Sequence, residues 1–263
     1  MLEFLKDAPL EIEDLFLLED FQIGYLPGYV AERELAAALH AYPSIARFLK
    51  AKCPSVTAFI DGIMAEHAPA RDEEELESLC QTAVRSIDDL LVYNKCPELY
   101  DAAPFHRWDF AEVVRIASLE GKVVIDAGAG TGRVALEAAD PAKWVFAVEP
   151  VTRLRRFIAE QAEGLRLGNV FVMDGFLHAI PLPSDFADVL ITSHALGWHL
   201  EDELTEFERV VGAGGHIIHC PGTADRPSDG ATHDLLVSPR WGYDWARYDE
   251  ADGPKRKYWK QVR

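Results

Sequence analysis

The chain has 263 residues, of which 49% are hydrophobic, and it carries a formal net charge of −18 at pH 7. This length suits one large core, or one core with a smaller appendage. The negative charge repels phosphate backbones, so we expect no nucleic-acid partner. The apolar runs are too short for a membrane helix and the start lacks a basic signal region, so we expect a cytoplasmic protein without a membrane partner.

The cysteines are scattered along the chain and form no CxxC pair. They therefore predict reduced thiols rather than a disulfide framework or a zinc site. Acidic residues are concentrated in the first part, because residues 1–120 hold 23 acidic and 10 basic side chains. This excess indicates either solvated helix faces or a docking surface for a basic partner.

Apolar residues recur at helical spacing from residue 10 to about 118. The acidic run 72–75 precedes a pattern that predicts one continuous buried stripe, formed by Leu76, Leu79, Cys80, Ala83, Ile87, Leu90 and Leu91. Proline-containing pairs predict breaks at Pro27-Gly28, Tyr42-Pro43, Cys53-Pro54 and Ala68-Pro69. We therefore expect a helical region over residues 1–105.

After Gly121, short apolar runs alternate with helical patterns, which is typical of a parallel sheet covered on both faces. The predicted strands cover 123–126, 144–149, 170–173, 189–192 and 216–219. The predicted helices cover 133–139, 152–164 and 201–211, the last one ended by the glycines of 212–215. Aromatic-rich segments at 241–248 and 256–262 predict a closing antiparallel hairpin. The expected fold is α/β, a doubly wound and mostly parallel sheet with an antiparallel last strand.

A glycine-rich turn, DAGAGTGR, joins the first predicted strand to the first helix of this sheet. Gly128, Gly130 and Gly132 permit positive φ and a close approach of backbone to ligand. In doubly wound sheets such a turn lies in the ligand crevice. A dinucleotide motif needs its third glycine one residue later, where Arg133 stands. The spacing therefore disfavours a nicotinamide-dependent oxidoreductase.

Two acids follow the next two predicted strands. Glu149 ends the second strand, at a distance from the glycine turn that suits hydrogen bonds to both hydroxyls of a ribose. Asp174 ends the third strand in VMDGF, where a carboxylate can read the amino edge of adenine. The ordered set of turn, acid and acid indicates an adenosine-containing ligand.

At these residues the chain resembles the class I S-adenosylmethionine-dependent methyltransferases, over roughly residues 105–263. The similar segments are VVIDAGAGTG, FAVEP, VMDGF, ADVLITSHALG, FERVVGAGGHIIH and the terminal hairpin. The resemblance implies a Rossmann-like methyltransferase domain over 106–263, with S-adenosylmethionine as cofactor. The loop SHALGW does not match the Asn/Asp-Pro-Pro-Tyr/Phe motif of the DNA-methylating branch, which argues against a nucleic-acid substrate.

The same resemblance implies a set of donor-site residues. Asp126 would face the amino-acid portion of the donor, Glu149 the ribose, and Ser193 with His194 the sulfonium and the methyl acceptor. The full expected set is Asp126, Ala127, Gly128, Gly130, Thr131, Gly132, Glu149, Pro150, Asp174, Gly175, Phe176, Ser193 and His194.

Methyl transfer from a sulfonium requires alignment and exclusion of water, and it uses a base only when the acceptor must lose a proton. His194 is the first candidate base, followed by His199 and His178, since neutral imidazole accepts protons near pH 7. The alternative is a histidine bonded within its own loop. His216 and His219 lie three apart on a strand and so on opposite faces, which predicts no metal site there.

Three further features have two interpretations each. Tyr93, Tyr100, His106 and Arg107 can reach the donor or form a lid, or else Tyr100 and Trp108 only pack between the two regions. Trp198 can wall an acceptor pocket or pack in the core. The basic segment KRKYWK predicts a charged strand face that discourages edge-to-edge pairing rather than a site for an anionic partner.

These observations together predict S-adenosylmethionine-dependent methyl transfer to a small-molecule acceptor by in-line displacement. The region over 1–105 would act as a lid or recognise the substrate. The alternatives are methylation of a protein side chain, and a non-catalytic scaffold or sensor that binds the same cofactor. The oligomeric state is not indicated.

Overall fold

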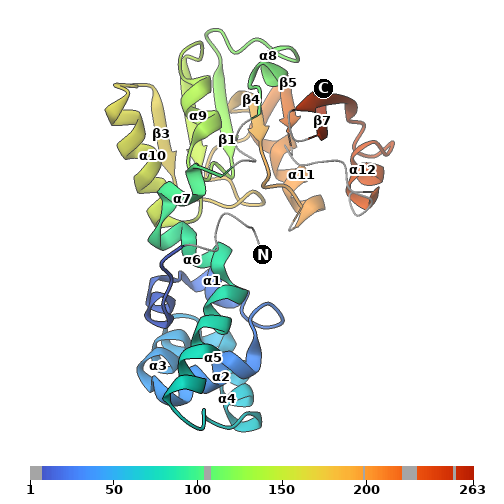
Figure 1. The fold of residues 1–263 in the computed structure, drawn as a ribbon. Helices are drawn as coiled ribbons and strands as arrows, with labels where there is room; N and C mark the ends of the chain where they lie inside the picture. The colour runs from blue at the N-terminus through green and yellow to red at the C-terminus, as the bar shows by residue number, and fades with distance from the viewer. Residues whose placement is uncertain (1–7, 104–107, 198, 221–229, 251–252) are drawn as a thin grey trace. The chain divides into compact units, whose positions relative to one another are not determined.

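The computed structural model describes residues 8–103, 108–197, 199–220, 230–250 and 253–263. The chain divides into two compact units, Met1–Ala102 and Ala103–Arg263 (Figure 1). Each unit has its own buried core, one in the first unit and two in the second. None of the helices in the described ranges combines the length and the apolar composition that crossing a membrane requires.

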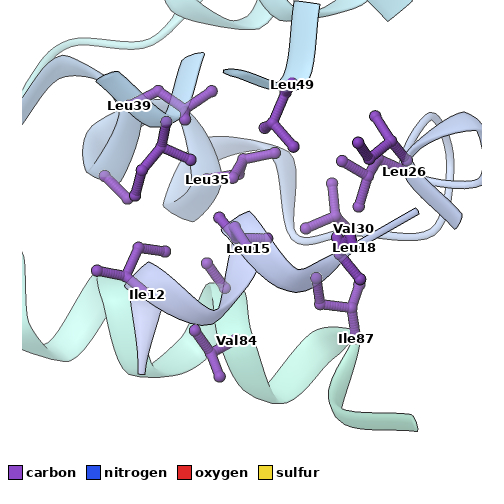
Figure 2. Close-up of a cluster of buried hydrophobic side chains, with 14 of the residues drawn as sticks. Ile12, Leu15, Leu18, Leu26, Val30, Leu35, Leu39, Leu49, Val84 and Ile87 are labelled. Carbon is purple, nitrogen blue, oxygen red and sulfur yellow. The ribbon is translucent and has the colours of Figure 1, made fainter. Parts of the chain in front are cut away.

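Short helices build the first unit. They are η2 (Ile12–Leu17), α1 (Asp20–Gly24), α2 (Glu32–Ala41), α3 (Pro43–Lys52), η3 (Pro54–Val56), α4 (Thr57–Glu66), α5 (Glu73–Ser86), α6 (Asp88–Lys95) and α7 (Pro97–Asp101). Pro43 and Pro54 begin their helices, where the missing N–H costs no hydrogen bond. Figure 2 shows Leu15, Leu35 and Val84 in one cluster, contributed by η2, α2 and α5.

Two helices, and not one, carry the stripe predicted over 76–91, because the helix breaks at Ile87. Ile87 has φ −130° and ψ 27°, and it separates α5 from α6. Just before the break, the Ser86 hydroxyl donates to the Ala83 carbonyl and accepts the N–H of Ala31. Since Ile87 stays fully buried, the apolar stripe continues although the helix does not.

The second unit is built on one seven-stranded sheet in the order β3-β2-β1-β4-β5-β7-β6. The strands are β1 (Val123–Ala127), β2 (Trp144–Val148), β3 (Val170–Met173), β4 (Ala187–Thr192), β5 (Val211–His219), β6 (Asp244–Glu250) and β7 (Gly253–Gln261). The first five are parallel, whereas β7 runs antiparallel to both β5 and β6. The predicted doubly wound sheet with a reversed last strand is therefore confirmed.

Helices cover both faces of this sheet (Figure 1). They are α8 (Ala111–Val114), α9 (Arg133–Ala138), α10 (Thr152–Gly164), α11 (Leu200–Val210) and α12 (Gly230–Leu236). Strand residues alternate between the two cores as a period of two requires. Val124 shares a core with Ala135 of α9, whereas its neighbour Ile125 shares the other core with Phe207 of α11.

Strand β5 begins earlier than predicted, and glycines 212–215, expected to end the preceding helix, lie within the strand. Helix α11 ends at Val210, and Val211 already pairs with Ala187, before a register shift between Ala187 and Val189. A Cβ on Gly215 would lie 2.7 Å from the Asp188 carbonyl oxygen, which leaves room for glycine alone. The glycines thus allow the register shift at the start of β5.

The prediction that the lysines of KRKYWK form a solvated, edge-protecting face is also wrong. Strand β7 is an interior strand, and β6 is the edge strand beside it. Lys255 and Lys257 are only 2% and 8% exposed. Lys257 Nζ lies 2.5 Å from Glu112 Oε2 of α8, and the same carboxylate also pairs with Arg115. Lys257 therefore belongs to an internal ion pair.

Candidate functional site

The glycine-rich turn between β1 and α9 adopts a backbone that favours glycine at three positions. Gly128, Gly130 and Gly132 have φ of +74°, +57° and +84°. The Gly128 N–H donates to the Val148 carbonyl at 2.9 Å, which ties the turn to the end of β2. A Cβ on Gly132 would lie 2.8 Å from Ile158 of α10. The turn is fixed from both sides and leaves no room for larger residues at Gly132.

Glu149 lies directly after β2 and holds the turn through its carboxylate. Oε2 accepts the N–H of Gly130 and Oε1 accepts the N–H of Val151, both at 2.9 Å, and the residue is 5% exposed. Each carboxylate oxygen can accept a second hydrogen bond. The structure thus brings the predicted glycine turn and the predicted ribose acid into direct contact.

Asp126, at the end of β1, is 1% exposed, and its Oδ2 accepts the N–H of Ala135 at 2.9 Å. The carboxylate therefore faces the first turn of α9. Burial raises the pKa of Asp126 to about 7, and the negative charge of Glu149 adds to this increase.

We expect this raised pKa to make stability depend on pH. The unfolded carboxyl loses its proton near pH 4, whereas the folded one keeps it up to about pH 7, so the unfolding free energy falls as pH rises between these values. The loss is on the order of a few kcal/mol. Asp126→Asn keeps an acceptor for Ala135 but has no proton to lose. Denaturant titrations from pH 5 to pH 8 should show a flatter pH dependence for the variant, and equal slopes would contradict the assignment.

Asp174, Gly175 and Phe176 follow β3. The Asp174 side chain is 69% exposed and forms an ion pair with Arg155 of α10 at 3.0 Å. A Cβ on Gly175 would lie 2.7 Å from Pro181 and 2.8 Å from Val148, so the backbone is closely packed there. Phe176 stacks on His178, with ring centroids 5.5 Å apart. These three predicted residues form one continuous rim beside the end of β2.

The loop after β4 contacts the glycine turn. A Cβ on Gly128 would lie 2.5 Å from the Ala195 Cβ, so the two backbones pack closely. His194 has a φ of +57°, and its Nδ1 lies 3.0 Å from Ser193 Oγ. The structure therefore places Ser193 and His194 on the loop that borders the turn.

The remaining predicted donor residues lie in the same turn and strand ends. Ala127 is fully buried in β1. The Thr131 hydroxyl is buried, and among the described residues it has no hydrogen-bond partner. Pro150 contributes a carbonyl that accepts from Arg155 at 2.6 Å. A buried hydroxyl without a partner in the turn is a polar group that a bound ligand can satisfy.

Other predicted histidines and aromatics are distributed over several places. His178 and His199 lie edge to face, with centroids 5.0 Å apart. Tyr93 and Tyr100 pair at 4.6 Å within the helical unit, whereas Trp108 is buried in a core of the sheet unit. His106, Arg107 and Trp198 lie outside the described residues.

His219 is buried, whereas His216 is half-buried, as expected for alternate strand positions. His219 Nδ1 lies 2.8 Å from Thr192 Oγ1. Burial lowers the pKa of His219 to about 3, so this imidazole stays neutral. In the parts of the chain that the structure describes, no group of three or more His, Cys, Asp or Glu is arranged to hold a metal ion.

Two residues of the site were not predicted. Glu203 of α11 accepts the N–H of Gly197 and of His199, both at 2.8 Å, and so fixes the loop after β4. Its position in the first turn of the predicted helix could have indicated that it binds the backbone of the preceding loop. Arg155 bonds to the ends of both β2 and β3. No local pattern indicates this, because Asp174 lies 19 residues further along the chain.

Comparisons with known proteins agree with this geometry. A family model described as a methyltransferase domain matches residues 125–219. An uncharacterised methyltransferase from Geobacillus thermodenitrificans is 28% identical over 177 residues, covering 64% of this chain and 76% of that protein. The uncharacterised methyltransferase YrrT from Bacillus subtilis is 31% identical over 88 residues, covering 34% of this chain and 39% of its own.

Among solved structures, an S-adenosylmethionine-dependent methyltransferase from Aquifex aeolicus has a TM-score of 0.53 at 20% identity. The match covers 65% of this chain and 98% of that one, and it shows a shared fold. The family match begins within β1 and ends at the last residue of β5, so it includes the glycine turn, both acids and the loop after β4. Residues 125–219 therefore match a methyltransferase domain, and the sheet unit shares the fold of an S-adenosylmethionine-dependent methyltransferase.

Proposed function

We propose that this enzyme methylates a small-molecule acceptor at the carboxyl edge of the sheet. One observation carries the proposal: the glycine turn, Glu149 and the loop after β4 meet within hydrogen-bond or van der Waals distance around Gly128 and Gly130. This edge is where doubly wound sheets bind ligands. The net charge of −18 disfavours nucleic acid as the acceptor.

The donor-holding roles follow from the positions of the side chains. The buried Glu149 carboxylate beside the turn suits the ribose hydroxyls, and the backbone from Gly128 to Gly132 can approach the amino-acid end closely. Asp174, Gly175 and Phe176 suit the adenine. In this proposal Asp126 supports the turn through α9, and Thr131 offers its hydroxyl to the ligand.

S-adenosylmethionine, when bound, supplies a methyl group on a positively charged sulfur that an in-line nucleophile can take. The protein has to align the acceptor and exclude water. Ser193 and His194 border the turn, so we assign them to the acceptor side. Where the acceptor carries a proton, the His194 imidazole would remove it.

The helical unit is proposed to recognise the acceptor or to act as a lid. Its buried core consists of residues of this unit. Its low share of basic residues makes small neutral or cationic acceptors more suitable than polyanions.

Isothermal calorimetry with S-adenosylmethionine, its demethylated product S-adenosylhomocysteine, and NAD tests the donor site. We expect both sulfur ligands to bind and NAD not to bind. Binding of NAD without the other two would contradict the site assignment.

Labelled methyl transfer into a cell extract then tests the acceptor class. We expect the label in the small-molecule fraction after separation by size. Label found only in the protein fraction would replace the small-molecule proposal by methylation of a protein side chain.

A further inference from the structure

Arg155 connects the two strand ends that carry the proposed ribose and adenine acids. It lies in the first turn of α10, and its side chain is 19% exposed. Nη1 lies 2.8 Å from the Glu149 carbonyl oxygen, 2.6 Å from that of Pro150 and 3.0 Å from Asp174 Oδ1. Nη2 lies 2.9 Å from Thr152 Oγ1. One guanidinium thus joins the end of β2 to the residue that follows β3.

These contacts fix an acid that its surroundings alone would leave mobile. With 69% of its side chain exposed, Asp174 has little packing to select one rotamer. An ion pair this exposed contributes little to stability. The ion pair instead orients the Asp174 carboxylate, because a planar guanidinium bound to two backbone carbonyls donates in a fixed direction.

We infer that Arg155 is a positioning residue that orients Asp174 and so makes the donor site selective for a 6-amino purine; this rests on the proposed function. The pair uses Oδ1 of Asp174. An ionised carboxylate only accepts hydrogen bonds. It therefore favours the amino group of adenine and repels the 6-oxo group of hypoxanthine, which is itself an acceptor.

The test compares the binding of S-adenosylhomocysteine with that of its 6-oxo analogue, S-inosylhomocysteine, by calorimetry. In the unsubstituted enzyme we expect a preference of about tenfold or more for the adenosyl compound. Arg155→Gln should lower the affinity for the adenosyl compound about tenfold and reduce the preference for it to about threefold or less. Arg155→Lys should restore part of the preference, since one ammonium cannot reach all four acceptors.

The matched control is Arg153→Gln, on the same helix, where Arg153 pairs with Glu160 at 3.4 Å. It should leave both affinities unchanged. Asp174→Asn should abolish the preference for the adenosyl compound. The double variant Asp174→Asn with Arg155→Gln should show the same ratio of affinities as Asp174→Asn alone, because the two residues act as one unit.

Several outcomes would overturn the inference. A merely structural Arg155 would lower the affinity for both compounds equally and leave their ratio intact. An unsubstituted enzyme that binds both compounds equally would show that Asp174 does not read the purine. If S-adenosylhomocysteine does not bind at all, the proposed donor site itself fails, and the inference fails with it.

Discussion

Glu149→Ala is expected to weaken the binding of S-adenosylhomocysteine at least ~10-fold, because it removes the proposed charge-assisted hydrogen bonds to the ribose. It also leaves the N–H groups of Gly130 and Val151 without their acceptor, so the glycine turn loses its support. Because both effects weaken the proposed donor site, Glu149→Ala has the largest expected effect on donor binding.

Calorimetry measures the affinity, and circular dichroism shows whether the variant is folded. Glu149→Gln keeps one oxygen but turns an amide N–H toward a backbone donor, so we expect an intermediate loss. Glu160→Ala, an exposed acid on α10, is the matched control and should not change the affinity. An unchanged affinity in folded Glu149→Ala would show that the ribose is bound elsewhere.

Glu112→Ala is expected to cost about 3 kcal/mol or more of unfolding free energy in the sheet unit. The substitution leaves the buried Lys257 ammonium without its carboxylate partner. Burial already lowers the pKa of Lys257, which indicates that its charge is poorly solvated. Removal of both partners, as Glu112→Leu with Lys257→Met, should recover most of the loss because no buried charge remains.

Tryptophan fluorescence during urea denaturation measures this effect selectively. All six tryptophans of the chain lie after residue 102, so the signal reports on the sheet unit alone. The control is Lys122→Met, which removes the exposed pair with Asp188 and should cost about 1 kcal/mol or less. A loss in Glu112→Ala no larger than in this control would refute the role of the buried pair.

The sheet was predictable because its strands are short apolar runs with clear boundaries. β3 and α10 have their predicted bounds, and β1 differs by one residue. The burial of Asp126 beside α9 could also be predicted from the sequence. Alternation places it on the same face of β1 as Val124, which belongs to the core with α9.

Other features depend on residues that are distant in sequence. The break at Ile87 is hidden because the apolar period continues through it, and the hydroxyl of the neighbouring Ser86 accepts the backbone N–H of Ala31, 55 residues earlier. The burial of Lys257 depends on Glu112, 145 residues earlier in the chain. Arg155 was missed for the same reason. Local patterns predicted the elements and the strand-end acids, whereas pairings between distant polar side chains required the structure.

The separate cores also set an order of folding during translation. The helical unit closes its core with residues up to Leu91, so it can fold as soon as those residues have left the ribosome. The central strand β1 must wait for β4, because Val124 pairs with Val189. While the ribosome makes the residues between them, the edge of β1 that later pairs with β4 stays unpaired. The acidic charge of the early-folding part would then keep the nascent chain from aggregating until the sheet is complete.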